Sequence, residues 1–201
     1  MTARELQKEK IKSIQKERMK SYFIDAAKKI VKEKGVAGLN ARKIGEEAGY
    51  SYATIYNYFD DMNHLMVAAA YSFLEECYLE LLSNTDHSKN ALEQLIIYTK
   101  TYFMYFINNP KAFDLVLLEK LGEKTKDFDG KSSVAHVLRD AIVECVREGY
   151  LKEENAETAQ KIISYYTNGK LVFCIGERDD LSSEDALNAI DKEIRYIMRQ
   201  C

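Results

Sequence analysis

Apolar residues recur at spacings of three and four along most of the chain, and no segment alternates strictly between apolar and polar residues. Spacings of three and four put apolar side chains on one face of an α-helix, whereas strict alternation would indicate a strand. A single proline and nine glycines in 201 residues interrupt such helices rarely. The sequence therefore predicts an all-α protein of about nine helices.

The ends of several helices can be placed from residues that commonly start or stop them. Gly35 and Gly49 each follow an apolar-periodic segment, where glycine often ends a helix. Asn40 can cap the second helix, because its side-chain oxygen accepts a backbone N–H left unpaired in the first turn. A charged loop is expected from Gly122 to Gly130. The predicted helices span residues 4–34, 41–48, 52–58, 61–82, 88–108, a segment after Pro110, 156–177 and 183–200.

Two short predicted helices, 41–48 and 52–58, are joined by a tight turn at Gly49, which is the layout of a helix-turn-helix. In that motif the second helix enters the major groove of DNA. Ile55 and Phe59 are four residues apart and face inward, so the other side chains point elsewhere. The outward candidates, which offer hydroxyls and amides to phosphates and base edges, are Tyr52, Thr54, Tyr56, Asn57 and Tyr58. The alternative is that these tyrosines only pack in an ordinary helical hairpin.

The segment 88–108 is apolar on nearly all sides, which predicts a central helix in the remainder of the chain. Its tyrosines follow one another at spacings of four and three. Burying a phenol without a hydrogen-bond partner costs about 1–3 kcal/mol, so the cluster indicates mutual hydrogen bonds or a polar ligand. The candidate residues of a pocket for a partly apolar molecule are Tyr98, Tyr102, Tyr105, Phe106, Phe113, Leu117, His136 and Tyr166. Simple packing of these rings is the alternative.

The last two predicted helices carry narrow apolar seams that suit a dimer interface. In the segment 183–200 the apolar residues step by three, four and three, while the segment 156–177 has Gly169 and Gly176, which allow close approach of a partner helix. The candidate interface residues are Ile163, Lys170, Phe173, Leu187, Ile190, Ile194 and Ile197. The alternative is that both seams pack only within one subunit.

Charge is distributed unevenly along the chain. Residues 1–64 carry 13 Lys and Arg against 9 Asp and Glu, whereas residues 65–201 carry 16 against 23. A basic first third on an acidic remainder suits a polyanion-binding head. No apolar run of about 18 residues is present, and the charged N-terminus has no apolar stretch, so we expect no membrane span, no signal peptide and a cytoplasmic protein.

The sequence contains no signature of a metal site, a cofactor site or an enzyme. The cysteines form no CxxC pair, and no His, Cys, Asp or Glu set has ligand spacing. There is also no nucleophile elbow, no Gly-rich phosphate loop and no HExxH. We therefore expect a protein that is not an enzyme, with mostly buried, reduced thiols. The cysteines are Cys77, Cys145, Cys174 and Cys201.

The run LNARKIGEEAGYSYATIYNYFDDMNHL, residues 39–65, resembles the DNA-binding signature of the tetracycline-repressor-type (TetR) family of bacterial transcription regulators. The likeness extends back through IDAAKKIVKEKG, residues 24–35. The positions that carry it, in order, are Ile24, Ala27, Gly35, Asn40, Ile44, Ala48, Gly49, Ser51, Thr54, Tyr56 and Phe59. The resemblance implies a three-helix DNA-binding domain over residues 1–62 and a helical ligand-binding and dimerisation domain over residues 63–201.

The resemblance further implies a homodimer that binds a palindromic operator in double-stranded DNA and is released by a small-molecule effector. By position it adds DNA contacts at Asn40, Arg42, Lys43 and Ser51, and the basic stretch before residue 20 could reach phosphate or a minor groove. A ligand-responsive repressor is the function that this combination predicts.

The chain departs from the family pattern at the start of the helix 61–82, where a Lys is usual. Here the chain reads Asp60, Asp61 and Met62, which suits the positive end of a helix but brings negative charge toward DNA. Two alternatives therefore stay open. One is a redox-responsive regulator that uses its buried cysteines, and the other is a helical interaction protein that has lost DNA binding.

Overall fold

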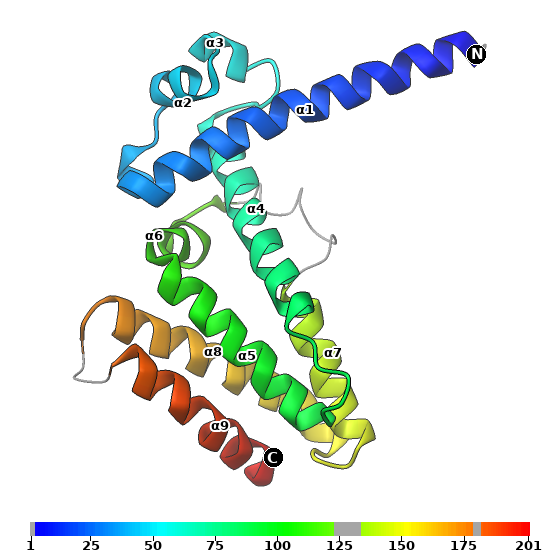
Figure 1. Cartoon of the computed structure of the whole chain (residues 1–201), viewed down its shortest axis with the longest axis vertical. Helices are drawn as coiled ribbons and strands as arrows, with labels where there is room; N and C mark the ends of the chain where they lie inside the picture. Colours follow the sequence, from blue (N-terminus) through cyan, green and yellow to red (C-terminus); the bar gives the residue numbers. More distant parts are fainter. Residues whose placement is uncertain (1–2, 123–133, 179–181) are drawn as a thin grey trace. The chain divides into compact units, whose positions relative to one another are not determined.

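The computed structural model describes residues 3–122, 134–178 and 182–201, which form helices joined by short connections (Figure 1). These ranges contain nine α-helices and no strand, so the predicted all-α class is confirmed. The described chain divides into two compact units, one of residues 3–73 and 111–122, the other of residues 74–110, 134–178 and 182–201. The predicted loop after Gly122 lies outside the described residues.

The first unit holds the N-terminal helices. Its α3 ends at Ile55, earlier than the predicted residue 58, because the N–H groups of Asn57 and Tyr58 donate to the carbonyls three residues back, Thr54 and Ile55, at 3.2 and 2.9 Å and so form turns. The elements are α1 Ala3–Lys34, the 3-10 turn η1 Val36–Gly38, α2 Ala41–Ala48, α3 Tyr52–Ile55, the first part of α4 Met62–Ser83, most of α6 Pro110–Phe113 and the π-helical turn η2 Asp114–Leu118.

The core of the first unit joins α1, α2 and α3. Phe23, Ile44 and Ile55 are fully buried, and Phe59 is 2% exposed, which confirms the predicted inward faces. The Phe23 ring lies 5.6 Å from the ring of Tyr50, so α1 supports the segment between α2 and α3 directly.

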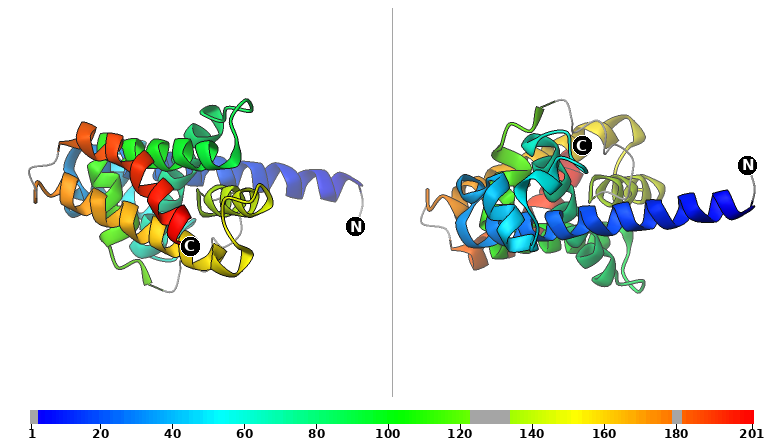
Figure 2. Two further views of the ribbon diagram at one scale, coloured as in Figure 1. Left: turned by 90° about the horizontal axis from the view of Figure 1, so that it is seen from below. Right: turned by 90° about the horizontal axis from the view of Figure 1, so that it is seen from above.

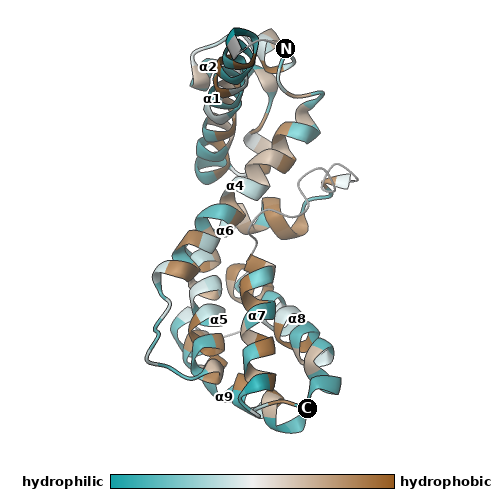
Figure 3. Cartoon of the chain, turned by 90° about the vertical axis from the view of Figure 1, so that its right-hand side faces the viewer, coloured by the Kyte–Doolittle hydropathy of each residue, from teal (hydrophilic) through white to brown (hydrophobic). Residues whose placement is uncertain are grey.

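The second unit is a bundle in which α5 packs against α7, α8 and α9, as its apolar character predicts. Figure 3 shows hydrophobic residues alternating with polar ones along these helices, as expected of helices with one buried face. The α9 bounds agree with the prediction. The elements are the rest of α4, α5 Ala91–Asn108, α7 Val134–Arg147, the 3-10 turn η4 Glu153–Asn155, α8 Ala156–Ile175 and α9 Ser183–Gln200.

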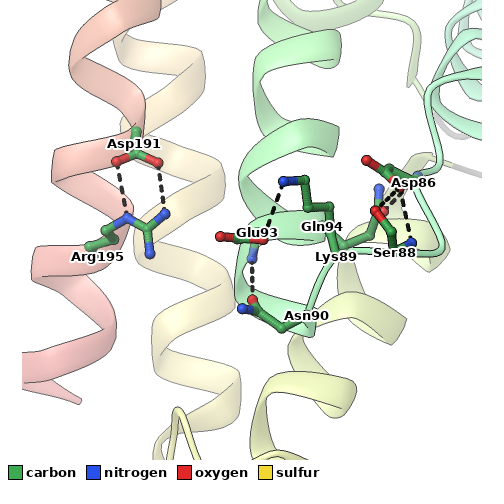
Figure 4. Close-up of polar contacts among 8 residues, drawn as sticks. All are labelled: Asp86, Ser88, Lys89, Asn90, Glu93, Gln94, Asp191 and Arg195. Atoms are coloured by element: carbon green, nitrogen blue, oxygen red, sulfur yellow. Dashed lines mark hydrogen bonds and ion pairs between the residues drawn. The ribbon is translucent and has the colours of Figure 1, made fainter.

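The start of α5 lies at Ala91 rather than at the predicted residue 88 because two side chains organise the preceding residues (Figure 4). Asn90 caps the helix by accepting the Glu93 N–H at 2.9 Å. Asp86 accepts from the Ser88 backbone N–H at 3.0 Å and from its hydroxyl at 2.6 Å, and these hydrogen bonds lower the pKa of Asp86. Residues 86–90 therefore form a turn that precedes the helix.

Within the described residues, none of the helices combines the length and the apolar character that crossing a bilayer requires.

Candidate DNA-binding surface and ligand cavity

The turn between α2 and α3 is built on close backbone contact. Gly49 ends α2 with a φ of 76°, a left-handed conformation that favours glycine. The Tyr50 N–H then donates to the Gly45 carbonyl at 2.9 Å. A Cβ on Gly45 would lie 2.8 Å from the Tyr50 carbonyl oxygen and 2.9 Å from the Tyr52 nitrogen. These contacts fix how α3 follows α2.

The start of α2 is capped as predicted. The oxygen of the Asn40 side chain accepts the Lys43 N–H at 2.9 Å. The NH2 of the same amide takes no part in this hydrogen bond and could donate to a phosphate. Arg42 and Lys43 are exposed on the same turn. Arg42 Nε lies 2.9 Å from the Glu46 carboxylate, an exposed pair of small energetic weight.

On α3 and the turn after it, the predicted contact residues separate into exposed and supporting ones. Tyr52 is 60% exposed, Tyr56 is 49% exposed, and the side chain of Asn57 is also exposed. Thr54 is half-buried, and its hydroxyl lies 2.9 Å from the hydroxyl of Ser51. Ser51 and Thr54 thus hold the start of α3, while the tyrosines and Asn57 offer their side chains outward.

Tyr58 takes a different position from the one predicted for it. Its ring is half-buried and lies 6.0 Å from the ring of Phe23 on α1. Its primary role in the structure is packing, although one edge also lines a surface groove next to Tyr22.

The acidic start of α4 has a structural role. Asp61 accepts the His64 N–H at 2.8 Å and so caps the helix. Met62, which stands at the family's Lys position, is half-buried against the core of the first unit. Asn63 donates to the Leu121 carbonyl at 2.7 Å and thereby ties the segment 111–122 to α4. The side chains of Asp61, Met62 and Asn63 in this first turn therefore make contacts within the protein.

A cavity of about 170 Å³ lies inside the second unit. Tyr102 donates to Asn168 at 2.8 Å, and the buried hydroxyls of Thr99 and Thr167 donate to carbonyls of their own helices. None of the described residues that line it carries a charge, so the cavity suits a neutral, mainly apolar molecule with one or two hydrogen-bonding groups. Its lining residues are Leu74, Thr99, Tyr102, Val134, Ala135, Leu138, Ile163, Ser164, Thr167 and Asn168.

Of the tyrosines on α5, only Tyr102 lines this cavity. Tyr98 is paired with the Thr85 hydroxyl at 2.9 Å, and Tyr105 donates to the Glu76 carboxylate at 3.1 Å. Burial and the nearby Glu76 carboxylate raise the pKa of Tyr105. These buried phenols therefore bond to Thr85, Glu76 and Asn168 rather than to one another, which differs from the mutual hydrogen bonds predicted from the sequence.

Five other predicted pocket residues are not among those that line the cavity. Phe106 is fully buried, with its ring between those of its tyrosine neighbours on α5, and Phe113 and Leu117 belong to the first unit. Tyr166 lies under the ammonium of Lys170, 5.0 Å from the ring centroid. His136 is half-buried on α7, where other residues of that helix line the cavity.

Three of the seven residues predicted for the dimer interface face inward, which corrects the prediction for those three. Ile163, Ile190 and Ile194 are at most 4% exposed inside the second unit, so they pack within it. Lys170 pairs with Glu193 at 2.6 Å and links α8 to α9 within the unit. Leu187 and Ile197 are half-buried, and among the predicted set only Phe173 is an exposed apolar side chain.

An exposed apolar face that the sequence interpretation missed lies on the other side of these two helices. Its residues are Ile162, Tyr165, Phe173 and Tyr196, which are 42, 72, 49 and 66% exposed. Gly169 shares this side of α8, because residues 162, 165, 169 and 173 are spaced by three and four. Ile162 directly precedes Ile163 of the predicted seam, so the exposed face and the seam differ by one residue along the helix.

The cysteines and acidic residues form no metal site among the described residues. Burial, with the Glu80 carboxylate nearby, raises the pKa of Cys77 to about 12. Burial also raises the pKa of Cys145 to about 12, with Glu148 and Glu144 adding to the effect. Because the thiolate is the reactive form, both groups are unreactive at neutral pH.

We expect a thiol reagent at pH 8 to modify Cys174 and Cys201 well before Cys77 and Cys145, because the first two are partly exposed and the others are buried with raised pKa values. Mass spectrometry of peptides from the labelled native protein measures the order. Labelling in denaturant should reach all four sites equally. Fast labelling of Cys77 in the native protein would contradict the expectation and favour the redox-responsive alternative.

Among the described residues, α2, the turn at Gly49 and α3 with its exposed side chains have the layout of a helix-turn-helix, the motif whose second helix enters the major groove of DNA. Residues 23–69 match the family model described as bacterial regulatory proteins, tetR family. This match, which covers the N-terminal part of the chain, supports its assignment to this family of DNA-binding transcription regulators.

Solved structures share the fold over most of the chain. A TetR family transcription regulator from Marinobacter aquaeolei is 18% identical, with a TM-score of 0.66, 89% of this chain and 94% of that chain covered. FadR from Bacillus subtilis, in complex with stearoyl-CoA, is 16% identical with a TM-score of 0.67 and coverages of 89% and 96%. A TetR variant from Acinetobacter baumannii, in complex with minocycline, is 16% identical with a TM-score of 0.63 and coverages of 89% and 93%. No curated protein is significantly similar in sequence.

Proposed function

We propose that the protein is a transcriptional repressor that binds a palindromic operator as a homodimer and is released by a small neutral effector. The observation that carries this proposal is the exposed surface of α3, supported on α2 by the close backbone contact at Gly45. Tyr52 and Tyr56 offer phenol groups to phosphate, and Asn57 offers an amide to a phosphate or a base edge.

The dimer is proposed to form through the exposed apolar face of α8 and α9. Isolated exposed apolar residues are common, but here several large ones share one side of two adjacent helices. Gly169 would let a partner helix approach closely, since nothing lies within 4 Å of a Cβ built there. A dimer with a two-fold axis through this face would carry two copies of α3, one for each half-site of a palindromic operator.

The effector is proposed to bind the cavity of the second unit. A cavity of about 150 Å³ in another protein holds benzene, so a volume of about 170 Å³ suits a molecule of one ring or an equivalent short chain. Asn168 and Tyr102 would bind its polar group. Such an effector is smaller than the stearoyl-CoA and minocycline bound by the two structural relatives.

Release is proposed to act through α4. Leu74 lines the cavity from α4, and the same helix begins directly after the helix-turn-helix. A molecule that packs against Leu74 can favour one position of α4 over another, and so one spacing of the two recognition helices over another. The effector shifts the equilibrium between the DNA-binding form and the released form only as far as its affinities for the two forms differ.

The proposal is tested by selecting bound sequences from a pool of random double-stranded DNA with the purified protein. We expect a palindrome to be enriched, and Tyr56→Ala to weaken its binding by about tenfold or more, because a contact on the exposed recognition surface is lost. Leu79→Ala is the control, since Leu79 is also exposed (56%) but lies on α4 in the second unit. Equal binding of all sequences would overturn the repressor proposal and favour the interaction protein.

A further inference from the structure

The N-terminal arm, defined here as residues 4–20 of α1, extends the helix beyond the part that packs in the first unit (Figures 1 and 2). Residues 4–18 are all exposed, and the first fully buried side chain of the helix is Phe23. The family match also begins at residue 23. The arm therefore lies outside the matched residues, and core packing does not explain it.

The arm is strongly basic. It carries seven Lys and Arg against three Glu. Figure 3 shows polar colouring along most of α1. Lys8, Lys12, Lys16 and Lys20 succeed one another at intervals of four, so they form a row along one side of the helix. Like charges at this spacing repel one another, so the row favours an anionic partner.

A groove of about 550 Å³ runs beside this row and reaches the helix-turn-helix. Its lining includes three cationic side chains and two tyrosines, and the three glutamates of the arm are not among the lining residues. Tyr58, in the turn that follows α3, closes one end. We call this the arm groove; its lining residues are Lys12, Gln15, Lys16, Arg18, Met19, Tyr22 and Tyr58.

The chemistry of the arm groove fits the DNA backbone. Ammonium and guanidinium groups bind phosphate oxygens, and tyrosine hydroxyls donate to them as well. The arm rises by about 1.5 Å per residue, so its exposed residues 4–18 extend over roughly 20 Å, the length of several nucleotides of backbone. The position of Tyr58 directly after α3 makes the groove continuous with the surface that would read the operator.

We propose that the arm groove binds a stretch of DNA phosphates flanking the base pairs read by α3. This proposal rests on DNA binding by α2 and α3. The arm adds affinity that is independent of sequence, while the recognition helix supplies the sequence preference. In a dimer two arms would bind, one on each flank of the operator.

The test is a triple variant in which Lys12→Gln, Lys16→Gln and Arg18→Gln remove the groove cations. Glutamine has nearly the helix propensity of lysine and arginine, so the arm stays helical, which far-ultraviolet circular dichroism verifies. Affinities are measured at several salt concentrations for the selected operator duplex and for a random duplex of equal length. We expect at least about a tenfold loss on both, and a salt slope smaller by about 0.9 for each phosphate contact removed.

A matched control removes the same number of positive charges from the second unit through Lys152→Gln, Lys192→Gln and Arg199→Gln, all exposed positions. The control should keep the slope of the unaltered protein. An unchanged slope in the groove variant, with the operator still preferred, would overturn the arm proposal alone. A reduced slope without any preference for the operator in the unaltered protein would support the arm and overturn the repressor. Absence of all DNA binding by the unaltered protein would overturn both.

Discussion

We expect Phe23→Ala to lower the free energy of unfolding by about 3–5 kcal/mol, because it removes a whole ring from a packed core. Phe23 is fully buried, and its ring contacts Tyr50 and Tyr58, at centroid distances of 5.6 and 6.0 Å. These two tyrosines flank α3 in sequence. The cavity left by the ring would therefore loosen both ends of the recognition element, so operator binding should fall together with stability.

Urea denaturation followed by circular dichroism measures the stability change, and binding to the selected duplex measures the functional one. Tyr22→Ala is the control for the stability change only, because Tyr22 is 52% exposed, so its loss should cost less than about 1 kcal/mol, but it also lines the arm groove. A Phe23→Ala variant as stable as the Tyr22→Ala variant would contradict the claim that the buried Phe23 ring on α1 supports the residues that flank α3.

The second large effect is expected from Gly45→Ala. In an ordinary helix interior this change stabilises by about 1 kcal/mol, because alanine has the higher helix propensity. Here the added Cβ would lie 2.8 Å from the Tyr50 carbonyl oxygen and 2.9 Å from the Tyr52 nitrogen, and backbone atoms cannot rotate away. We therefore expect destabilisation of about 1–3 kcal/mol and a displaced α3.

The displacement should lower operator affinity by about tenfold or more, since a base contact depends on placement within a fraction of an ångström. Thermal unfolding and operator binding are measured side by side. Glu46→Ala, at the next residue of α2, removes only an exposed pair with Arg42 and should change stability by less than about 1 kcal/mol. If Gly45→Ala raised the melting temperature, the close approach of α2 and α3 would be refuted.

The parts of the fold that depend on neighbouring residues could be predicted from the sequence. The start of α2 follows from Asn40 and its end from Gly49, and both signals act within one helical turn. The inward faces of Ile55 and Phe59 follow from their spacing alone. The candidate DNA-binding surface lies in one short stretch of chain, which is why its residues could be proposed with the helix-turn-helix.

The cavity and the exposed face of α8 could not be predicted in the same way. The cavity is formed by residues from α4, α5, α7 and α8, so no single segment carries its pattern, and Ser164 and Asn168 were missed. On α8 the error was a matter of helical phase, because a shift of one residue rotates the side chain by about 100°. Ile163 therefore faces the core and Ile162 faces outward, although both are equally apolar in the sequence.

The segment 111–122 supplies buried residues to the first unit, and this limits how such regulators can be recombined. Leu115 is fully buried, Ala112 is 1% exposed, and Lys111 donates to the Glu33 carbonyl at 2.6 Å. Consider a chimaera that takes residues 1–73 from this protein and everything after them from another protein. The positions of Lys111, Ala112 and Leu115 would then be filled by residues of the other protein. Transferring the first unit to another protein therefore requires two segments, residues up to 73 and the segment 111–122. The second segment carries Leu121, whose carbonyl accepts the hydrogen bond from Asn63.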